Sequence, residues 1–184
     1  DRKGNFWIGT RDGLCRYDGE SFIHLTTEEG LSHNLVISLL EDEKGGIWIG
    51  TRAGLNRLTV KVENDIENYT LTRLSGADGL LESQIEAIRE DSRGNLWLGI
   101  FGGGVVACEG ESLRLYDDKV GLSNNYVRDL CFDSHENLWI ATAGGGINKL
   151  NPNSFHHVYN KQVHSTLEDS RGNIWLGTMH DGIL

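Results

Sequence analysis

Short apolar runs alternate with polar, glycine-containing turns along the whole chain. In one representative stretch the apolar runs are residues 85–89, 96–99, 105–108 and 113–116. The segments between them favour tight turns, because Asp and Asn bond their own backbone and Gly accepts a positive φ angle. No run has the length or the 3.6-residue period of an amphipathic helix. The pattern therefore predicts four short β-strands joined by tight turns.

This four-strand pattern recurs five times. Each copy carries an Asp six residues before a Trp, and every Trp of the chain occupies this position: Asp1 and Trp7, Asp42 and Trp48, Asp91 and Trp97, Asp133 and Trp139, and Asp169 and Trp175. In the last four copies an aliphatic residue lies 12 positions before the Trp, at Val36, Ile85, Val127 and Val163. The spacing between successive Trp residues varies, so the connections between repeats must follow the Trp. A recurring motif of this period indicates a repeat architecture.

Four-stranded units of this size that stack face to face form a β-propeller. Neighbouring blades would cover both faces of a blade, which explains why residues 35–40 are apolar at successive positions rather than at alternate ones. A Trp at one fixed position of every repeat is typical of packing between blades. We therefore expect an all-β fold, a β-propeller made of four-stranded antiparallel blades. Residues 1–184 would form one propeller segment that starts and ends inside a blade.

The repeats resemble those of the two-component regulator propeller family. The residues that carry the resemblance are Asp-x-x-Gly-Asn-Leu-Trp-Ile-Gly-Thr, a following Gly-Gly-Leu, and Gly-Leu-Ser-x-Asn before the next aliphatic strand. The resemblance implies a larger, seven-bladed propeller, of which about five repeats are present. It also implies the periplasmic sensor region of a histidine kinase, often a hybrid kinase with an attached DNA-binding regulator. The chain departs from the motif locally, at Gly46, Ile100, Glu136 and Ala141.

The composition limits the classes of partner that this segment can bind. The net charge of −10 argues against nucleic acid as a partner of this segment, because phosphate binding requires clustered Lys and Arg. No apolar run reaches 18 residues, so we expect no membrane contact by this segment. Cys15, Cys108 and Cys131 show neither metal-ligand spacing nor an even disulfide framework, and buried free thiols are expected. A periplasmic location, in the extracytoplasmic part of an inner-membrane protein, is implied by the resemblance alone.

The repeated Asp invites comparison with calcium loops and with the Asp-box of sialidases. A calcium loop needs several oxygen ligands within one short segment, whereas residues 91–95 offer one Asp and one Asn. In the Asp-box the Trp lies five positions after the Asp, whereas in this chain it lies six positions after it. No arginine triad with a Tyr nucleophile can be assigned either. We therefore expect a turn-forming role for the Asp, and neither a metal site nor sialidase activity.

The seven His residues form no metal-binding or metalloprotease motif. Streptogramin lyases are propellers with related repeats and a catalytic His, and in this chain His180 lies in a comparable loop setting. A lone His is more often a surface residue than a catalytic base. We therefore expect no catalytic residue and no cofactor, so that this segment is not an enzyme, although a kinase domain could lie outside it.

Two sets of loops should share one face of the propeller. One set joins consecutive blades, at residues 30–34, 79–83 and 121–125, and the other follows the Trp strand. The residue before the loop Gly in the second set varies, and variable side chains on a uniform scaffold are where binding specificity is placed. Arg side chains suit an acidic sugar or another carboxylate, and Phe suits a sugar ring. We predict ligand contacts, with exposed residues of no function as the open alternative, at Arg11, Arg52, Phe101, His33 and His180.

Three functions remain open at this point. The leading hypothesis is a non-catalytic sensory module that binds a small molecule or glycan, or signals through homodimer contacts. The alternatives are a propeller enzyme of the lyase or glycan-hydrolase type and a structural scaffold that docks another protein. The fold class alone does not distinguish among these three functions.

The distance from the outer apolar residue to the next aliphatic residue is unusually short in the fourth repeat. It is 14 residues from Phe22 to Val36 and from Leu113 to Val127, but 8 from Phe155 to Val163. Either the outer strand is shortened so that residues 160–162 can cross to the next repeat, or a loop is absent from the numbered chain. We favour the second. The long spacing between Trp48 and Trp97 predicts instead an insertion around residues 60–68, in an outer hairpin.

Overall fold

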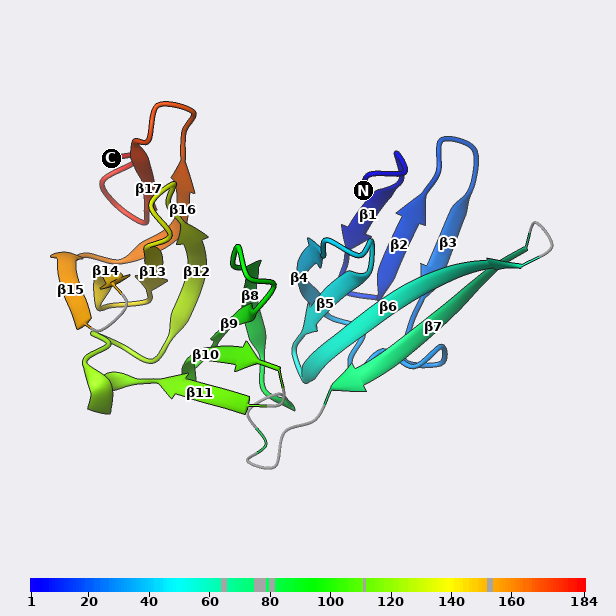
Figure 1. Cartoon of the computed structure of the whole chain (residues 1–184), viewed down its shortest axis with the longest axis horizontal. Coiled ribbons are helices and arrows are strands. Elements are labelled where there is room, and N and C mark those ends of the chain that lie inside the picture. Colours follow the sequence, from blue (N-terminus) through cyan, green and yellow to red (C-terminus); the bar gives the residue numbers. More distant parts are fainter. Residues whose placement is uncertain (64–65, 75–78, 80–81, 111, 152–153) are drawn as a thin grey trace. The chain divides into compact units, whose positions relative to one another are not determined.

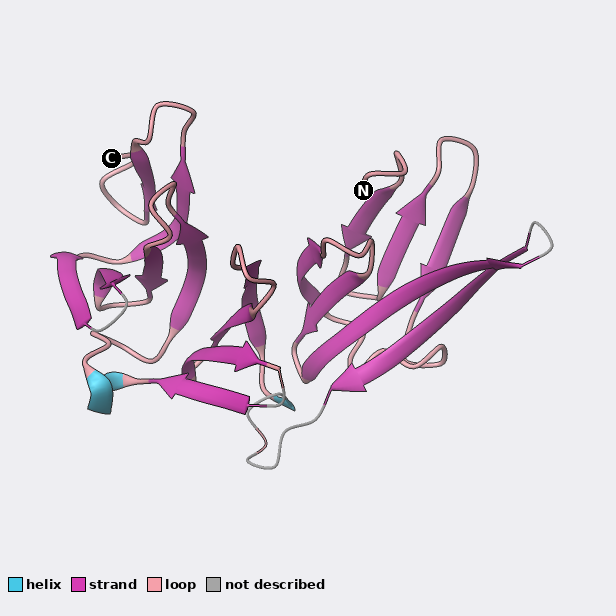
Figure 2. Cartoon of the chain, viewed as in Figure 1, coloured by secondary structure: helices cyan, strands magenta, loops and turns pink. Residues whose placement is uncertain are grey.

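Each repeat folds as an antiparallel β-sheet of up to four strands. The computed structural model describes residues 1–63, 66–74, 79, 82–110, 112–151 and 154–184. Over these residues the chain forms two compact units, Asp1–Ile85 and Glu86–Leu184, which together contain five sheets (Figures 1 and 2). The predicted all-β class and the predicted four-stranded antiparallel units are therefore confirmed.

The first unit contains a three-stranded sheet of order β1-β2-β3 and a four-stranded sheet of order β4-β5-β6-β7. The strands are β1 (Phe6–Gly9), β2 (Leu14–Tyr17), β3 (Phe22–Leu25), β4 (Val36–Glu41), β5 (Ile47–Thr51), β6 (Gly54–Glu63) and β7 (Ile66–Leu74). The β6–β7 hairpin is the predicted insertion: its pairing continues outward from Leu58 and Leu71 to Glu63 and Ile66. Residues 64–65 of the predicted insertion lie outside the described residues.

The second unit contains two four-stranded sheets, β8-β9-β10-β11 and β12-β13-β14-β15, and the pair β16-β17. Their bounds are β8 (Ile85–Glu90), β9 (Leu96–Ile100), β10 (Gly104–Glu109), β11 (Ser112–Tyr116), β12 (Val127–Phe132), β13 (Leu138–Thr142), β14 (Gly146–Asn151), β15 (Ser154–Tyr159), β16 (Val163–Glu168) and β17 (Ile174–Thr178). A 3₁₀ turn, η2 (Asp118–Val120), follows β11 (Figure 2).

The constant spacing of 12 residues between the aliphatic residue and the Trp is explained by how the sheets pack. The aliphatic residue that starts each segment lies on the residue two positions after the Trp in the Trp strand of the preceding sheet, which is Gly in most copies. A Cβ added at Gly9 would lie 2.7 Å from Cγ1 of Val36, and one added at Gly99 would lie 2.7 Å from Cγ1 of Val127. The Gly therefore leaves space for the aliphatic side chain, so the two sheets can stack closely. At Ala141, the exception to the motif, the side chain shares a buried cluster with Val163.

The five Trp residues occupy equivalent positions, because each is the second residue of its strand. Trp97 is 9% exposed and packs between two sheets, stacked on Tyr116 at 5.5 Å between ring centroids and edge-on to Phe132 at 5.9 Å. Trp175 is 45% exposed, so the prediction that every Trp is packed between blades is wrong for this copy. Its strand belongs to the β16–β17 pair, whose outer face no further sheet covers among the described residues.

The Gly-Leu-Ser-x-Asn segments clamp one sheet to the next. The amide of Ser32 donates to Oδ1 of Asn56 on β6 at 2.9 Å, and the amide of Ser123 donates to Oδ1 of Asn148 on β14 at 3.1 Å. Both Asn side chains are fully buried. The corresponding third-strand residue of the β8–β11 sheet is Val106, so the buried Asn of the clamp has no counterpart in this sheet. Leu80 and Leu81, in the predicted loop before that sheet, lie outside the described residues.

The chain crosses from β15 to β16 in three residues, 160–162. The outer strand is not shortened to allow this. Strand β15 runs to Tyr159, which pairs with Ile147, and it contains a register shift that adds one residue. The alternative of a shortened outer strand is therefore wrong, and the alternative of an absent loop stays a prediction.

We expect the Asn148→Ala variant to lower the free energy of unfolding by about 1–3 kcal/mol, because it leaves buried partners in the Ser123 clamp without hydrogen bonds. Urea unfolding followed by circular dichroism measures the change. Asn160→Ala, at an exposed position, is the control and should change stability by less than about 0.5 kcal/mol. Equal effects of the two substitutions would show that the clamp contributes nothing.

Candidate functional site

The repeated Asp closes its own turn and orients its Trp. In the 91–97 copy, Oδ1 of Asp91 accepts hydrogen bonds from the amides of Arg93 and Asn95, and Oδ2 accepts from Nδ2 of Asn95 and Nε1 of Trp97 at 3.0 and 3.1 Å. The indole-to-carboxylate bond recurs at 2.8–2.9 Å from Trp7, Trp139 and Trp175 to the Asp of the same repeat. The predicted turn-forming role is confirmed, and the six-residue spacing is explained by the indole bond, which the sequence analysis did not identify.

The second copy departs from this pattern. Gly46 stands where the other copies have Asn, so no amide side chain is available to donate to Asp42. Arg57, which pairs with Trp48 across the strands, supplies the missing donors: its Nε and Nη2 lie 3.0 and 2.6 Å from Oδ2 of Asp42. The guanidinium also lies 5.3 Å from the centre of the Trp48 ring. One Arg thereby replaces the Asn amide and also packs on the Trp.

These carboxylates are held in the ionised form. Burial raises the pKa of Asp91 and Asp133, but the hydrogen bonds from the Asn and Trp side chains and from the turn amides outweigh it, so both pKa values lie below their usual range. At Asp169 the bonds from Asn173 and Trp175 lower the pKa in the same way. Because these oxygens accept N–H bonds within their own turns, they are not free to ligate calcium. Among the described residues, no three His, Cys, Asp or Glu side chains form a group that could hold a metal ion.

In the first unit the predicted loop residues Arg11, His33 and Arg52 lie at one end of the two sheets. The loop that carries His33 runs between the other two, since the amide of Val36 donates to Thr10 and the amide of Arg52 donates to Leu35. Both Arg side chains are exposed. Nδ1 of His33 accepts the amide of Leu35 at 2.8 Å, so this His stabilises its own loop.

In the second unit Phe101 and His180 lie in loops of different sheets, and no contact among the described residues joins them. Phe101 is 37% exposed and packs edge-on against Tyr126, at 4.9 Å between ring centroids. The guanidinium of Arg128 lies 4.9 Å from the centre of the Phe101 ring. The sequence pattern indicates only Phe101 of this exposed pair of rings, because Tyr126 and Arg128 come from the next sheet.

His180 is exposed in the loop after β17. Its neighbour Asp181 accepts hydrogen bonds through Oδ2 from Tyr159 at 2.8 Å and from Lys161 at 2.9 Å. The bonds from Lys161 and Tyr159 lower the pKa of Asp181. This carboxylate is therefore occupied by two donors and is a poor candidate for a base partner of His180.

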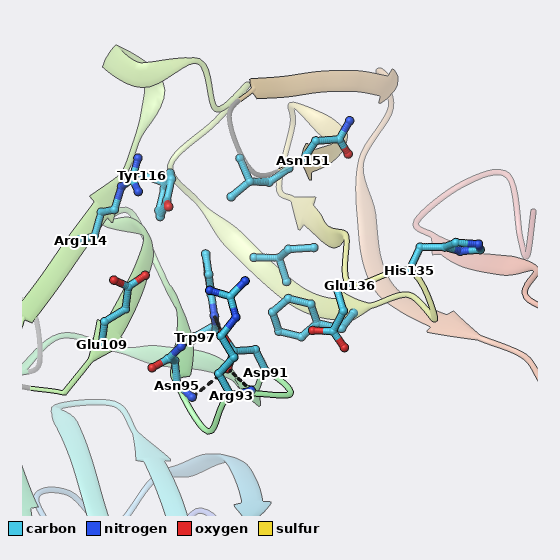
Figure 3. A pocket seen from close by; sticks show the side chains of 13 residues that line it. Asp91, Arg93, Asn95, Trp97, Glu109, Arg114, Tyr116, His135, Glu136 and Asn151 are labelled. Atoms are coloured by element: carbon cyan, nitrogen blue, oxygen red, sulfur yellow. Dashed lines mark hydrogen bonds between the residues drawn. The ribbon is translucent and has the colours of Figure 1, made fainter.

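The structure reveals a cavity that the sequence analysis missed. Its volume is about 260 Å³, and it opens between the Asp turns of the β8–β11 and β12–β15 sheets. Trp97, Tyr116, Phe132, Leu138 and Leu150 line it with apolar surface, and the polar lining residues include Arg93, Glu109, Arg114 and Glu136. Figure 3 shows Arg93 and Glu109 directed toward the cavity, while His135 points away. The strand β9 begins at this end and leads to Phe101 at the other, so the cavity lies opposite the predicted loop face.

The three cysteines carry no disulfide and are partly buried, in accordance with the expected free thiols. Burial raises the pKa of the Cys108 thiol to about 11 and also raises the pKa of Cys131. These two thiols stay protonated at neutral pH and are weak nucleophiles.

Comparison with known proteins supports the repeat pattern. A family model described as "Two component regulator propeller" matches residues 30–53, 79–102, 121–144 and 160–180, about half of the chain. No curated protein matches the chain significantly. No helix among the described residues has the length and hydropathy needed to cross a bilayer.

Several solved structures are similar to the whole chain. The extracellular domain of the putative hybrid two component system BT3049 from B. thetaiotaomicron is 25% identical with a TM-score of 0.80, and the chain covers 100% of itself and 26% of that protein. The corresponding domain of BT4673 from the same organism is 23% identical, with a TM-score of 0.78 and coverage of 100% and 28%. The chain thus spans about a quarter of the length of these proteins, and the predicted β-propeller fold is confirmed.

A virginiamycin B lyase from Staphylococcus aureus is also similar, with 15% identity and a TM-score of 0.71. The match covers 100% of this chain and 66% of the lyase. At this identity the likeness concerns the fold alone.

We expect the free energy of unfolding to decrease as the pH falls below about 5, with the steepest loss below pH 3.9, where an Asp of the unfolded chain is largely protonated while the folded Asp side chains are still ionised. The pKa values of Asp91, Asp133 and Asp169 are lowered in the folded chain. The stability that these ionised side chains contribute is therefore complete above the pKa of an unfolded Asp, and it is lost as the pH falls toward the pKa of the folded state. Urea unfolding between pH 2.5 and pH 7 measures it.

The Asp133→Asn variant should be less stable at pH 7 and should lose less stability on acidification. Asp12→Asn, at an exposed loop position, is the control and should follow the unsubstituted protein. A pH profile of Asp133→Asn that runs parallel to that of the unsubstituted protein would show that this turn contributes nothing to acid sensitivity.

Proposed function

Because the chain belongs to the two-component regulator propeller family, we propose that it is a non-catalytic sensory module of a two-component signalling protein. The observation that carries this proposal is the full-length likeness of the chain to extracellular domains of putative hybrid two component systems. The module would bind a small molecule or a glycan and pass the signal on, with homodimer contacts as one route. The identity of the ligand is part of the proposal.

The location belongs to the same proposal. The similar two-component proteins are described as extracellular domains, and we place this chain in the periplasm, in the extracytoplasmic part of an inner-membrane protein. The net charge of −10 gives no basis for direct contact with nucleic acid or with an anionic membrane surface. The segment would therefore meet its ligand in solution.

The loop face supplies the chemistry for binding. In the first unit two exposed guanidinium groups, of Arg11 and Arg52, flank the His33 loop and suit the carboxylate of an acidic sugar, which Arg binds in a bidentate way. In the second unit the exposed rings of Phe101 and Tyr126 suit the apolar face of a sugar ring. His180 remains a proposed contact by its place in the equivalent loop.

We expect a disaccharide that contains glucuronic acid to bind, and the Arg11→Ala and Arg52→Ala variants each to weaken binding about tenfold, because each removes a charge-assisted hydrogen bond. Isothermal titration calorimetry measures the affinity. Arg171→Ala, an exposed Arg in an Asp turn at the other end of its sheet, is the matched control and should bind normally. Unchanged binding by both loop variants would remove the acidic-ligand part of the proposal.

A lyase-type enzyme is the second candidate, because virginiamycin B lyase shares the fold. It would need His180 to act as a base, and the neighbouring Asp181 is occupied by Tyr159 and Lys161. We expect no turnover of a cyclic depsipeptide lactone such as virginiamycin B, measured by mass spectrometry of the product. Turnover that disappears in His180→Ala but persists in His164→Ala, at another exposed His, would overturn the non-catalytic assignment.

A further inference from the structure

The cavity between the β8–β11 and β12–β15 sheets has a structural irregularity at its opening. At the fourth position of the Asp turn the other copies have Gly, with φ between 77° and 87° at Gly4, Gly45, Gly94 and Gly172. Glu136 occupies this position with φ of 62°, a left-handed conformation that costs a residue with a Cβ about 1–2 kcal/mol. An unfavourable backbone conformation that is retained at the edge of a cavity indicates a role for its side chain.

The charges at the opening are of both signs and largely unpaired. Arg93, Glu109 and Arg114 form no ion pair with any side chain in the part of the chain that the structure describes, and Arg114 lies 5.0 Å from the centre of the Tyr116 ring. Glu136 accepts one hydrogen bond through Oε2, from Oγ of Ser92 at 2.8 Å, which holds the carboxylate at the opening. A ligand with one sign of charge would meet a repelling group beside each attracting one.

The size of the cavity limits the ligand. Its volume of about 260 Å³ lies just below the range of roughly 300–1,000 Å³ found for drug-sized ligands, so a single small molecule fits and an oligosaccharide does not. Trp97, Phe132 and Leu138 form an apolar and aromatic part of its wall, beside the polar side chains of Asp91 and Asn95. An apolar group inside and charges of both signs at the opening describe a small zwitterion with an apolar side chain.

We propose that this cavity binds a free α-amino acid with a large apolar side chain. The carboxylate lies on Arg93 and Arg114, which offer several N–H donors each. The ammonium group donates to the carboxylates of Glu109 and Glu136. The side chain enters the aromatic interior. This site is at the opposite end of the strands from the loop face, and the proposal does not depend on ligand binding there.

Calorimetric titration with L-phenylalanine tests the charge requirement. L-phenylalanine should bind, and N-acetyl-L-phenylalanine amide, phenylacetate and phenethylamine should each bind at least about tenfold more weakly, since each lacks one or both charges. D-glucose should not bind. Equal affinities for L-phenylalanine and the neutral amide, or no binding of L-phenylalanine at millimolar concentration, would overturn the proposal.

The variant Glu136→Gly separates binding from folding. It restores the residue of the other four turns, so the thermal midpoint should not fall, while the affinity for L-phenylalanine should fall about tenfold. Arg93→Gln should have the same effect on affinity. Arg171→Gln, at the matching position of the 169–175 copy, should leave affinity unchanged. Equal losses in Arg93→Gln and Arg171→Gln would contradict the proposal.

The indole N–H resonances in a ¹H–¹⁵N spectrum locate the bound ligand. The signal of Trp97, assigned through Trp97→Phe, should shift on titration, and the signal of Trp175, which makes the same hydrogen bond outside the cavity, should not. A shift confined to Trp175 would place the ligand elsewhere and overturn the proposal. Failure here leaves the loop-face proposal intact, because that proposal is tested on Arg11 and Arg52.

Discussion

The hydrogen bond from the Trp indole to the Asp carboxylate of the same repeat is the interaction on which the packing of the sheets depends. It closes the turn, holds the Asp in its ionised form and fixes the indole at the start of the strand that follows the turn. Once the ring is fixed, the next sheet can pack against it, as Phe132 packs against Trp97. The aliphatic residue that begins this next sheet then meets the Gly after the Trp, which admits it because it has no Cβ.

Departures from the repeat show how the Asp turn is maintained when one of its residues changes. Where the turn lacks its Asn, Arg57 donates to Asp42 from the third strand and packs on Trp48. Where the turn lacks its Gly, Glu136 accepts a left-handed conformation and directs a carboxylate toward the neighbouring turn. The first substitution preserves the turn by a new contact. The second also places a carboxylate at the edge of a cavity, and it thereby distinguishes this copy from the other four.

The two ends of the sheets differ in what they can bind. At the loop end of the first unit the Ser32–Asn56 clamp holds the backbone, and the side chains of Arg11 and Arg52 are exposed. In the second unit the Ser123–Asn148 clamp holds the backbone, and Phe101 is exposed. At the turn end the groove between two sheets is wide enough for a cavity, because Trp97 and Tyr116 form its wall rather than fill it. In the second unit the sheets therefore carry exposed side chains at the loop end and a small cavity at the turn end.

The sequence by itself determined the repeat, the strands and their turns, because those depend on local chemistry: Asp, Asn and Gly at the turns, aliphatic runs in the strands, and a Trp at constant spacing from its Asp. It also placed the extra length in the β6–β7 hairpin, since the insertion lay between two strand patterns. The tertiary structure alone decided which side chains meet across sheets. Tyr126 and Arg128 join Phe101, and Glu136 reaches Ser92, through contacts between residues 25–44 positions apart whose alignment depends on how one sheet stacks on the next. The cavity could not be predicted from the sequence for the same reason: its wall comes from six strands of two sheets, and no single segment contains its pattern.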